Sequence, residues 1–177
     1  MKKYELTAEF IEQWGKKLFR IKALISFGSV EAGELGGYVE KEDNLAQDGD
    51  AWVCDNAWVC DNARVYGNAW VCDDARVYGN ARVCDNAWVC DNADYLLIGR
   101  IGSRFSFTTF FKNKDKGITV SCGCFLGTIA EFRAKVTDTH GNNKHAKMYN
   151  LAADMAELQI LGEEYFDKLN TNKSEPF

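Results

Sequence analysis

This 177-residue sequence lacks most of the features by which an activity is recognised in a sequence. It has no apolar run long enough to span a membrane, and its first residues, MKKYELTAEF, lack the apolar stretch of a secretory signal. It also lacks a serine elbow, a paired-carboxylate motif and a phosphate-binding loop. We therefore expect a protein with no membrane partner, no cofactor and no catalytic residues.

The cysteines do not form a recognisable framework either. There are seven, which is an odd number, and none belongs to a CxxC pair. This pattern excludes a zinc ribbon and an even set of disulfides, so we expect no metal site. In a reducing cytoplasm we expect the cysteines to remain thiols that pack as small apolar side chains.

What the sequence does contain is a repeat. Residues 51–92, here called the coil array, consist of the units AWVCDN, AWVCDN, ARVYGN, AWVCDD, ARVYGN, ARVCDN and AWVCDN. Each unit is too small to bury a core alone, so the units must stack on one another. Alternation of Ala and Val with variable residues predicts a short strand, and the Asp or Gly that follows predicts a corner.

The coil array resembles the hexapeptide-repeat family of left-handed parallel β-helices. The resemblance implies that an aliphatic residue, and a small residue two positions earlier, fill a triangular core. The aliphatic positions are Val53, Val59, Val65, Val71, Val77, Val83 and Val89. The small positions are Ala51, Ala57, Ala63, Ala69, Ala75, Ala81 and Ala87. The expected fold class is mainly β, with a short left-handed parallel β-helix at residues 51–93.

If three units make one coil, residues eighteen apart stack at a strand spacing of ~4.8 Å. One outward face, here called the Trp–Cys face, then carries Trp52, Trp70, Trp88, Cys54, Cys72 and Cys90. Stacked cysteines of this kind could meet disulfide geometry. An exposed apolar patch rich in Trp is typical of an interface, so we expect a homo-oligomer through these six residues. The family resemblance suggests a trimer; a dimer or a purely local aromatic ladder are alternatives.

The array is flanked by regions of different pattern. Residues 1–50 predict a β-rich cap, with alternating runs KYEL and KLFRIKAL around a turn at WGK. Within it, residues 37–50 predict an irregular first coil, because Val39 and Leu45 are in phase with the alanines of the array. Residues 163–177 have the composition of a polar tail.

Residues 94–162 predict a small α+β domain with an antiparallel sheet and two helices. YLLIGRIG, RFSFTTFF and ITVSCGCF alternate as strands. Thr128 and Glu131 form a capping box that opens the first helix. A second helix is expected from about residue 144, with Met148, Ala152, Met155 and Leu158, or alternatively Leu151 and Leu158, at helical spacing.

The whole arrangement resembles a group of uncharacterised proteins from bacteriophages and prophages. The resemblance rests on YELT…LFRIKAL…FGSVEAGELGGYVEKEDNLAQDGDAWV, the array, and ITVSCGCFLGTIAEF…HGNNKHAKMY. It covers nearly the whole chain and implies a phage-encoded protein acting in the bacterial cytoplasm. It carries no functional residue over to this sequence.

The basic part of the chain predicts where an anion would bind. The net charge is −5, yet residues 93–162 hold nine Lys or Arg against six Asp or Glu. Guanidinium groups bind phosphate in a bidentate manner, and aromatic rings stack on bases. We expect the ligand contacts to be Arg100, Arg104, Arg64, Arg76 and Arg82, with Trp58 or Phe107 stacking on a base.

Three functions remain open. The first is a non-catalytic protein that sequesters an anionic nucleotide-type immune signal of the host, and no nucleic acid is expected as a partner. The second is a structural or protein-interaction spacer. The third is a hexapeptide-repeat acyltransferase, a family that uses a histidine base on or near the coils, whereas His140 and His145 lie outside the array.

Overall fold

The computed structural model describes residues 1–162. The predicted polar tail, residues 163–177, lies outside the described residues. The chain divides into two compact units, Met1–Asn92 and Ala93–Phe177, which we call the first unit and the C-terminal unit. A short 3-10 turn, η2 (Asn92–Asp94), lies at the division. Each unit is described by itself.

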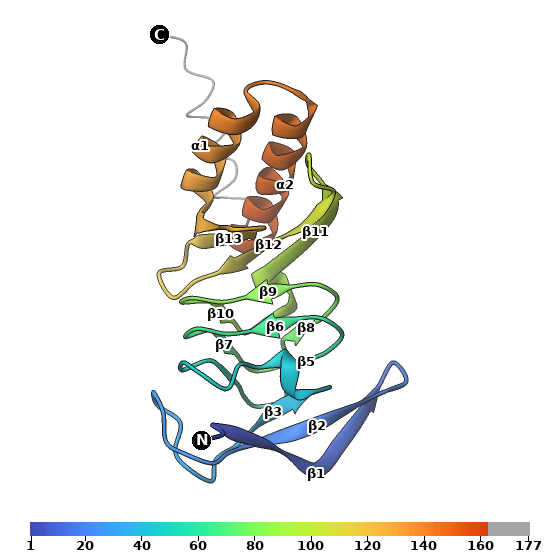
Figure 1. Ribbon diagram of the computed structural model, residues 1–177, viewed down its shortest axis with the longest axis vertical. Helices are drawn as coiled ribbons and strands as arrows, with labels where there is room; N and C mark the ends of the chain where they lie inside the picture. Colours follow the sequence, from blue (N-terminus) through green and yellow to red (C-terminus); the bar gives the residue numbers. More distant parts are fainter. Residues whose placement is uncertain (163–177) are drawn as a thin grey trace. The chain divides into compact units, whose positions relative to one another are not determined.

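In the first unit, every repeat contributes one two-residue strand, and the strands of successive coils lie above one another (Figure 1). The strands are β4 (Trp52–Val53), β5 (Trp58–Val59), β6 (Arg64–Val65), β7 (Trp70–Val71), β8 (Arg76–Val77), β9 (Arg82–Val83) and β10 (Trp88–Val89). Residues eighteen apart pair in parallel, as in Trp52 with Trp70 and Trp70 with Trp88. This pairing confirms the prediction that three units make one coil.

The core of the coils is built from the repeated alanines and valines. All seven alanines and all seven valines of the array have an exposed fraction of 0%, as the alternation predicts. In the first six units, the second residue after the strand turns the chain with a left-handed φ, for example 55° at Asp55 and 71° at Gly67. Asp and Gly tolerate this conformation better than most residues, which explains why they alternate at the corner.

A β-hairpin precedes the coils. β1 (Tyr4–Gln13) and β2 (Lys16–Ala23) pair antiparallel around the predicted turn. β2 also pairs with β3 (Leu35–Val39), and β3 pairs in parallel with β5. The hairpin therefore extends one column of the coil array into a five-stranded sheet, ordered β1-β2-β3-β5-β8.

The first coil has a different register from the one predicted. It contains β3 and the 3-10 turn η1 (Glu42–Asn44). Val39 pairs with Val59, and Leu45 forms a bridge with Val65, so both residues take valine positions and not the alanine positions predicted. Gly37 allows this shift, because a Cβ at Gly37 would collide with the carbonyl oxygen of Ala57.

The C-terminal unit is an antiparallel sheet packed against two helices (Figure 1). Its strands are β11 (Tyr95–Ile101), β12 (Ser106–Lys112), β13 (Ile118–Cys122) and β14 (Phe125–Thr128), in that order. The helices are α1 (Ile129–His140) and α2 (Lys144–Leu161). The predicted sheet and helices are confirmed, except that ITVSCGCF is not one strand: β13 ends at Cys122, Gly123 turns with a φ of 63°, and β14 begins at Phe125.

The helices begin and pack as follows. Thr128 and Glu131 form the predicted capping box at the start of α1. On α2, the predicted apolar face is wrong, because Met148, Met155 and Leu158 are exposed and only Ala152 of that set is buried. The buried face consists of Ala146, Tyr149, Ala152, Ala153, Ala156 and Ile160. Small alanines let α2 approach its neighbours closely, and this outweighs the larger apolar residues on the other face.

Within residues 1–162, no helix is long and apolar enough to cross a membrane.

Candidate functional site

The C-terminal unit contains a cavity of about 190 Å³, here called the Arg104 cavity. Its basic lining residues are Arg104, Lys135 and His140. Its hydroxyl groups come from Ser103, Ser106, Thr139 and Tyr149. None of the residues that line this cavity is acidic. The cavity therefore offers hydrogen-bond donors and positive charge, which is the chemistry that binds an anion.

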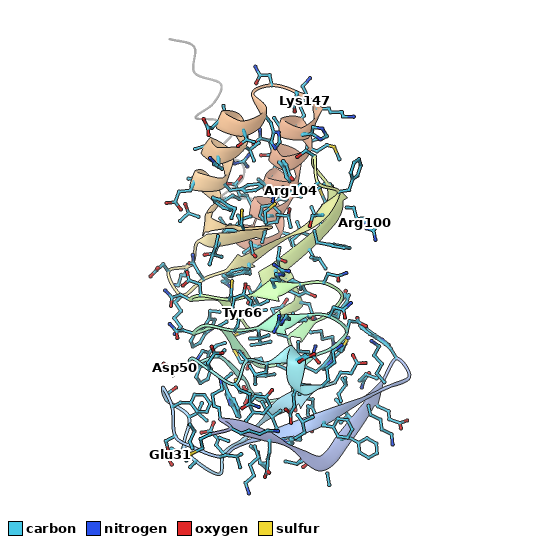
Figure 2. All side chains as sticks on the ribbon, viewed as in Figure 1. Glu31, Asp50, Tyr66, Arg100, Arg104 and Lys147 are labelled. Atoms are coloured by element: carbon cyan, nitrogen blue, oxygen red, sulfur yellow. A yellow bond between two sulfur atoms is a disulfide. The ribbon has the colours of Figure 1, made fainter. Side chains whose placement is uncertain are left out.

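Arg104, labelled in Figure 2, belongs to one turn of the C-terminal unit and approaches a second. It lies in the turn between β11 and β12, and its Nη1 atom is 3.3 Å from where a Cβ of Gly123 would be. The absence of a side chain at Gly123 thus leaves space for the guanidinium group next to the turn between β13 and β14. A larger residue at this place would push against the arginine.

Tyr149 connects α2 to the turn that carries Arg104. Its hydroxyl group contacts Gly102 so closely that a Cβ at Gly102 would overlap it. Its ring stacks on His140, with centroids 5.8 Å apart, and meets Phe132 edge to face at 5.6 Å. Burial raises the pKa of Tyr149, while the nearby charge of Arg104 acts in the opposite direction. The tyrosine therefore remains a neutral hydroxyl donor at physiological pH.

The cysteines near the cavity differ in exposure. Cys124 is exposed, whereas Cys122 is half-buried and accepts a hydrogen bond from the Thr108 hydroxyl at 3.2 Å. Both side chains border the cavity.

The other predicted ligand residues of this unit lie elsewhere. Arg100 is exposed on β11 and does not line the Arg104 cavity. The ring of Phe107 packs over Gly99, where it occupies the space of a Cβ. Neither residue joins Arg104 in this cavity, because Arg100 is exposed on its strand and Phe107 covers Gly99 of the neighbouring strand. Their role as ligand contacts stays a prediction.

In the first unit, Arg64 and Arg82 stack in register on neighbouring coils. Both line a groove of about 520 Å³ whose other wall carries Glu42, Asp43 and Asp48. The carboxylates offset the positive charge of the arginines, so this groove is less suited to a polyanion than the Arg104 cavity.

Trp58 and Arg76, which were predicted to contact a ligand, lie next to the hairpin, and a hairpin residue covers Trp58. Trp58 has an exposed fraction of only 5%. Trp14, at the hairpin turn, packs edge to face on its ring at 4.8 Å, and the Arg76 guanidinium lies 5.8 Å from the same ring. Trp58 is therefore not available to stack on a base, and the Arg76 guanidinium lies against its ring.

The Trp–Cys face is only partly exposed. The expectation that Trp52 lies on the surface is wrong: its exposed fraction is 0%, because Phe27 and Tyr4 pack edge to face on it at 5.4 and 6.4 Å. Trp70 and Trp88 do stack, with ring centroids 6.2 Å apart and planes 14° apart. Trp88 remains 42% exposed, so an exposed aromatic surface persists at one end of the column.

The expectation that all cysteines stay thiols is also wrong. Cys72 and Cys90 form a disulfide between neighbouring coils, with Cα atoms 4.7 Å apart. The stacking of residues eighteen apart brings the two sulfur atoms together. Cys54, in the same column, is a free thiol, and burial raises its pKa to about 12.

Several cavity residues were not singled out from the sequence as ligand contacts. Lys135 and Thr139 are four residues apart on α1, and Tyr149 belongs to α2. Lys135 and Thr139 each adjoin or lie close in sequence to the buried apolar residues Phe132 and Val136, and this helical spacing was a usable signal. It does not reveal, however, which loop of the sheet the helices face.

Comparison with known proteins identifies the repeat. The family described as the YdcK β-solenoid repeat matches residues 57–73 and 75–93. The matched segments lie almost entirely within the coil array, which is therefore a β-solenoid repeat. No curated protein matches the chain.

Proposed function

We propose that this chain is a non-catalytic binding protein that holds a small phosphate-bearing ligand of the nucleotide type in the Arg104 cavity. One observation carries the proposal: Arg104 and Lys135 line a cavity together with several hydroxyl groups, and none of its lining residues is acidic. A guanidinium group offers two parallel hydrogen bonds to a phosphate, and hydroxyl groups supply further donors.

The size of the cavity limits which part of the ligand enters it. About 190 Å³ is smaller than the ~300–1,000 Å³ typical of pockets that enclose a drug-sized ligand. The cavity would therefore receive the phosphoryl group, and the base would remain outside.

Phe105 is the candidate for the base contact. It adjoins Arg104 in the chain, is 70% exposed, and adopts a left-handed φ of 48°. This conformation is uncommon for a residue with a large side chain, and such strain is concentrated at functional sites. Stacking on its ring would stabilise the complex by about 1–3 kcal/mol.

The proposal contains no covalent step, so the ligand would leave chemically unchanged. Together with the resemblance to phage proteins, this supports a role in which the chain sequesters a nucleotide-type immune signal in the bacterial cytoplasm. We further propose that the chain forms a homo-oligomer, with a trimer as the expected state, through the exposed part of the Trp–Cys face around Trp70 and Trp88.

Calorimetric titration with inorganic phosphate and a panel of mono-, di- and cyclic nucleotides tests the proposal. Arg104→Glu should weaken binding by at least about 100-fold, because it removes a charge-assisted contact and adds repulsion. The matched control Arg100→Glu, exposed and outside the cavity, should change affinity less than about threefold. Circular dichroism should show both variants folded.

Two outcomes would contradict the proposal. One is the absence of binding to every member of the panel. The other is an equal loss of affinity in Arg100→Glu and Arg104→Glu, which would indicate a diffuse electrostatic effect and no defined site.

A further inference from the structure

The column of cysteines on the Trp–Cys face has a geometry that the other cysteines of the array lack. Cys54, Cys72 and Cys90 follow one another at the same register on successive coils. Cys60 lies opposite Tyr78, one residue beyond the pair Val59 and Val77. Thiols can therefore meet a second thiol along this column, whereas Cys60 has an aromatic neighbour.

A carboxylate lies close to the sulfur atoms of Cys72 and Cys90. The Sγ atoms of Cys72 and Cys90 and a carboxylate oxygen of Asp73 all lie within 4.8 Å of one another. Cys72 is buried, Cys90 is half-buried and Asp73 is exposed. Two sulfur ligands and one oxygen ligand at this spacing suit a thiophilic divalent cation that has access from solvent.

A similar group within residues 1–162 shows the contrast. Glu40, Cys60 and Asp61 are equally close together, but the ammonium group of Lys16 contacts both carboxylates. The lysine therefore already supplies positive charge to these two carboxylates. Among the described residues no lysine contact to Asp73 is found, and the N–H of Asp73 donates to the Asp55 carboxylate at 3.3 Å.

We propose that the reduced form of this chain binds a divalent cation of the zinc class through Cys72, Cys90 and Asp73. Two molecules of a monothiol reduce the Cys72–Cys90 disulfide to two thiols and become a disulfide themselves. The metal ion then replaces the two thiol protons, which are released to solvent. Three protein ligands leave the fourth tetrahedral position to water.

The charge of the surroundings favours this exchange. Asp55 and Asp73 are carried one coil apart on the same edge, and two thiolates would add to their negative charge. A divalent cation offsets the repulsion among these groups. The metal and the disulfide exclude each other, because both need the same two sulfur atoms, and either one connects the two coils.

Titration of the fully reduced protein with cobalt(II), followed by zinc displacement, tests the inference. The wild type should take up one equivalent with the visible spectrum of a tetrahedral thiolate site. Cys72→Ser and Cys90→Ser should each weaken binding at least about 100-fold, whereas the control Cys60→Ser should not. The oxidised wild type should bind no metal at this site.

Asp73→Asn provides a second variant, since this residue is exposed and its replacement leaves both thiols in place. It should weaken binding about tenfold. The inference is overturned if the reduced wild type shows no tetrahedral uptake, or if Cys60→Ser reduces uptake as much as Cys72→Ser. Unchanged affinity in Asp73→Asn would contradict the assignment of Asp73 as a metal ligand.

Discussion

The coil array and the C-terminal unit use their side chains in opposite ways. In the array, two residues of every six are small or aliphatic and fully buried, and identical contacts recur from coil to coil. In the C-terminal unit no pattern recurs, and a few residues from distant turns and helices line one cavity. Regular stacking repeats the same core contacts, whereas irregular packing brings unlike side chains from distant segments to one cavity.

The largest effect is expected from breaking the regular core. Val71→Asp places a charge at a position with an exposed fraction of 0%, in a core built from alanines and valines. The free energy of unfolding should fall by at least about 3–5 kcal/mol, because a buried charge without a partner is strongly unfavourable. Urea unfolding followed by circular dichroism measures this.

Asn80→Ala, at an exposed position of the same coil, is the matched control and should change stability by less than about 0.5 kcal/mol. Equal losses in both variants would contradict the assignment of Val71 to the core.

The next effect concerns the outer face of the array. Trp88→Glu should weaken self-association at least about 100-fold, because it places a charge on the exposed end of the Trp–Cys face. Light scattering coupled to gel filtration measures the change in mass. Trp14→Glu, which alters an exposed Trp on the hairpin, should leave the mass unchanged. If Trp88→Glu keeps the mass of the oligomer, the Trp column is not an interface and acts only as a local aromatic ladder.

How far the sequence predicts the structure differs between the two regions. The period of six predicts the strands, the corners and the buried Ala and Val, because the inward-facing residues of each unit meet the same residues of the stacked units. It does not predict the burial of Trp52 and Trp58, since the covering residues Phe27 and Trp14 come from outside the repeat. The same six-residue unit therefore has a different environment in the first coils.

In the C-terminal unit, the sequence predicts Arg104 as a ligand residue but not its partners. Lys135 and Tyr149 reach the cavity only through the packing of two helices on the sheet. The face of α2 was predicted wrongly because large apolar residues outrank alanine in hydropathy, while close packing selects alanine. The local sequence pattern does not predict contacts between residues that are far apart in the sequence, and these contacts form the cavity.

The third expected effect is a pH dependence of folding stability that comes from a buried lysine of the first unit. Lys3 is buried, and its ammonium group donates to the carbonyl oxygens of Gly49 and Ala51 at 3.2 and 2.8 Å. Burial lowers its pKa from 10.5 to about 8. Between these two values the unfolded chain binds more protons than the folded chain, so folded-state stability rises with pH over this window.

Comparison with Lys3→Met isolates this contribution. Relative to the variant, the wild type should gain roughly 3 kcal/mol of unfolding free energy between pH 7.5 and about 10.5. The free cysteines with raised pKa, such as Cys54 and Cys60, titrate in both proteins and cancel in the difference. A difference that does not depend on pH would contradict the burial of a charged Lys3.

The smallest effect compares two glycines, both with left-handed φ. Gly33 has a φ of 93° and open space around it, whereas Gly102 has a φ of 73° and lies against the Tyr149 hydroxyl. Gly33→Ala should cost about 1 kcal/mol for the backbone conformation alone. Gly102→Ala should cost about 1–2 kcal/mol more, because Tyr149 must move. Equal losses in thermal unfolding would show that Tyr149 does not hold the turn.

The most direct test of the central claim is the identity of the ligand that the protein releases. Wild type and Arg104→Glu are loaded with the tightest-binding nucleotide of the panel, washed and heat-denatured, and the supernatant is analysed by mass spectrometry. We predict near-stoichiometric, chemically intact nucleotide from the wild type and none from Arg104→Glu. Recovery of a cleaved or acylated product, or equal recovery from both proteins, would contradict a non-catalytic site at Arg104.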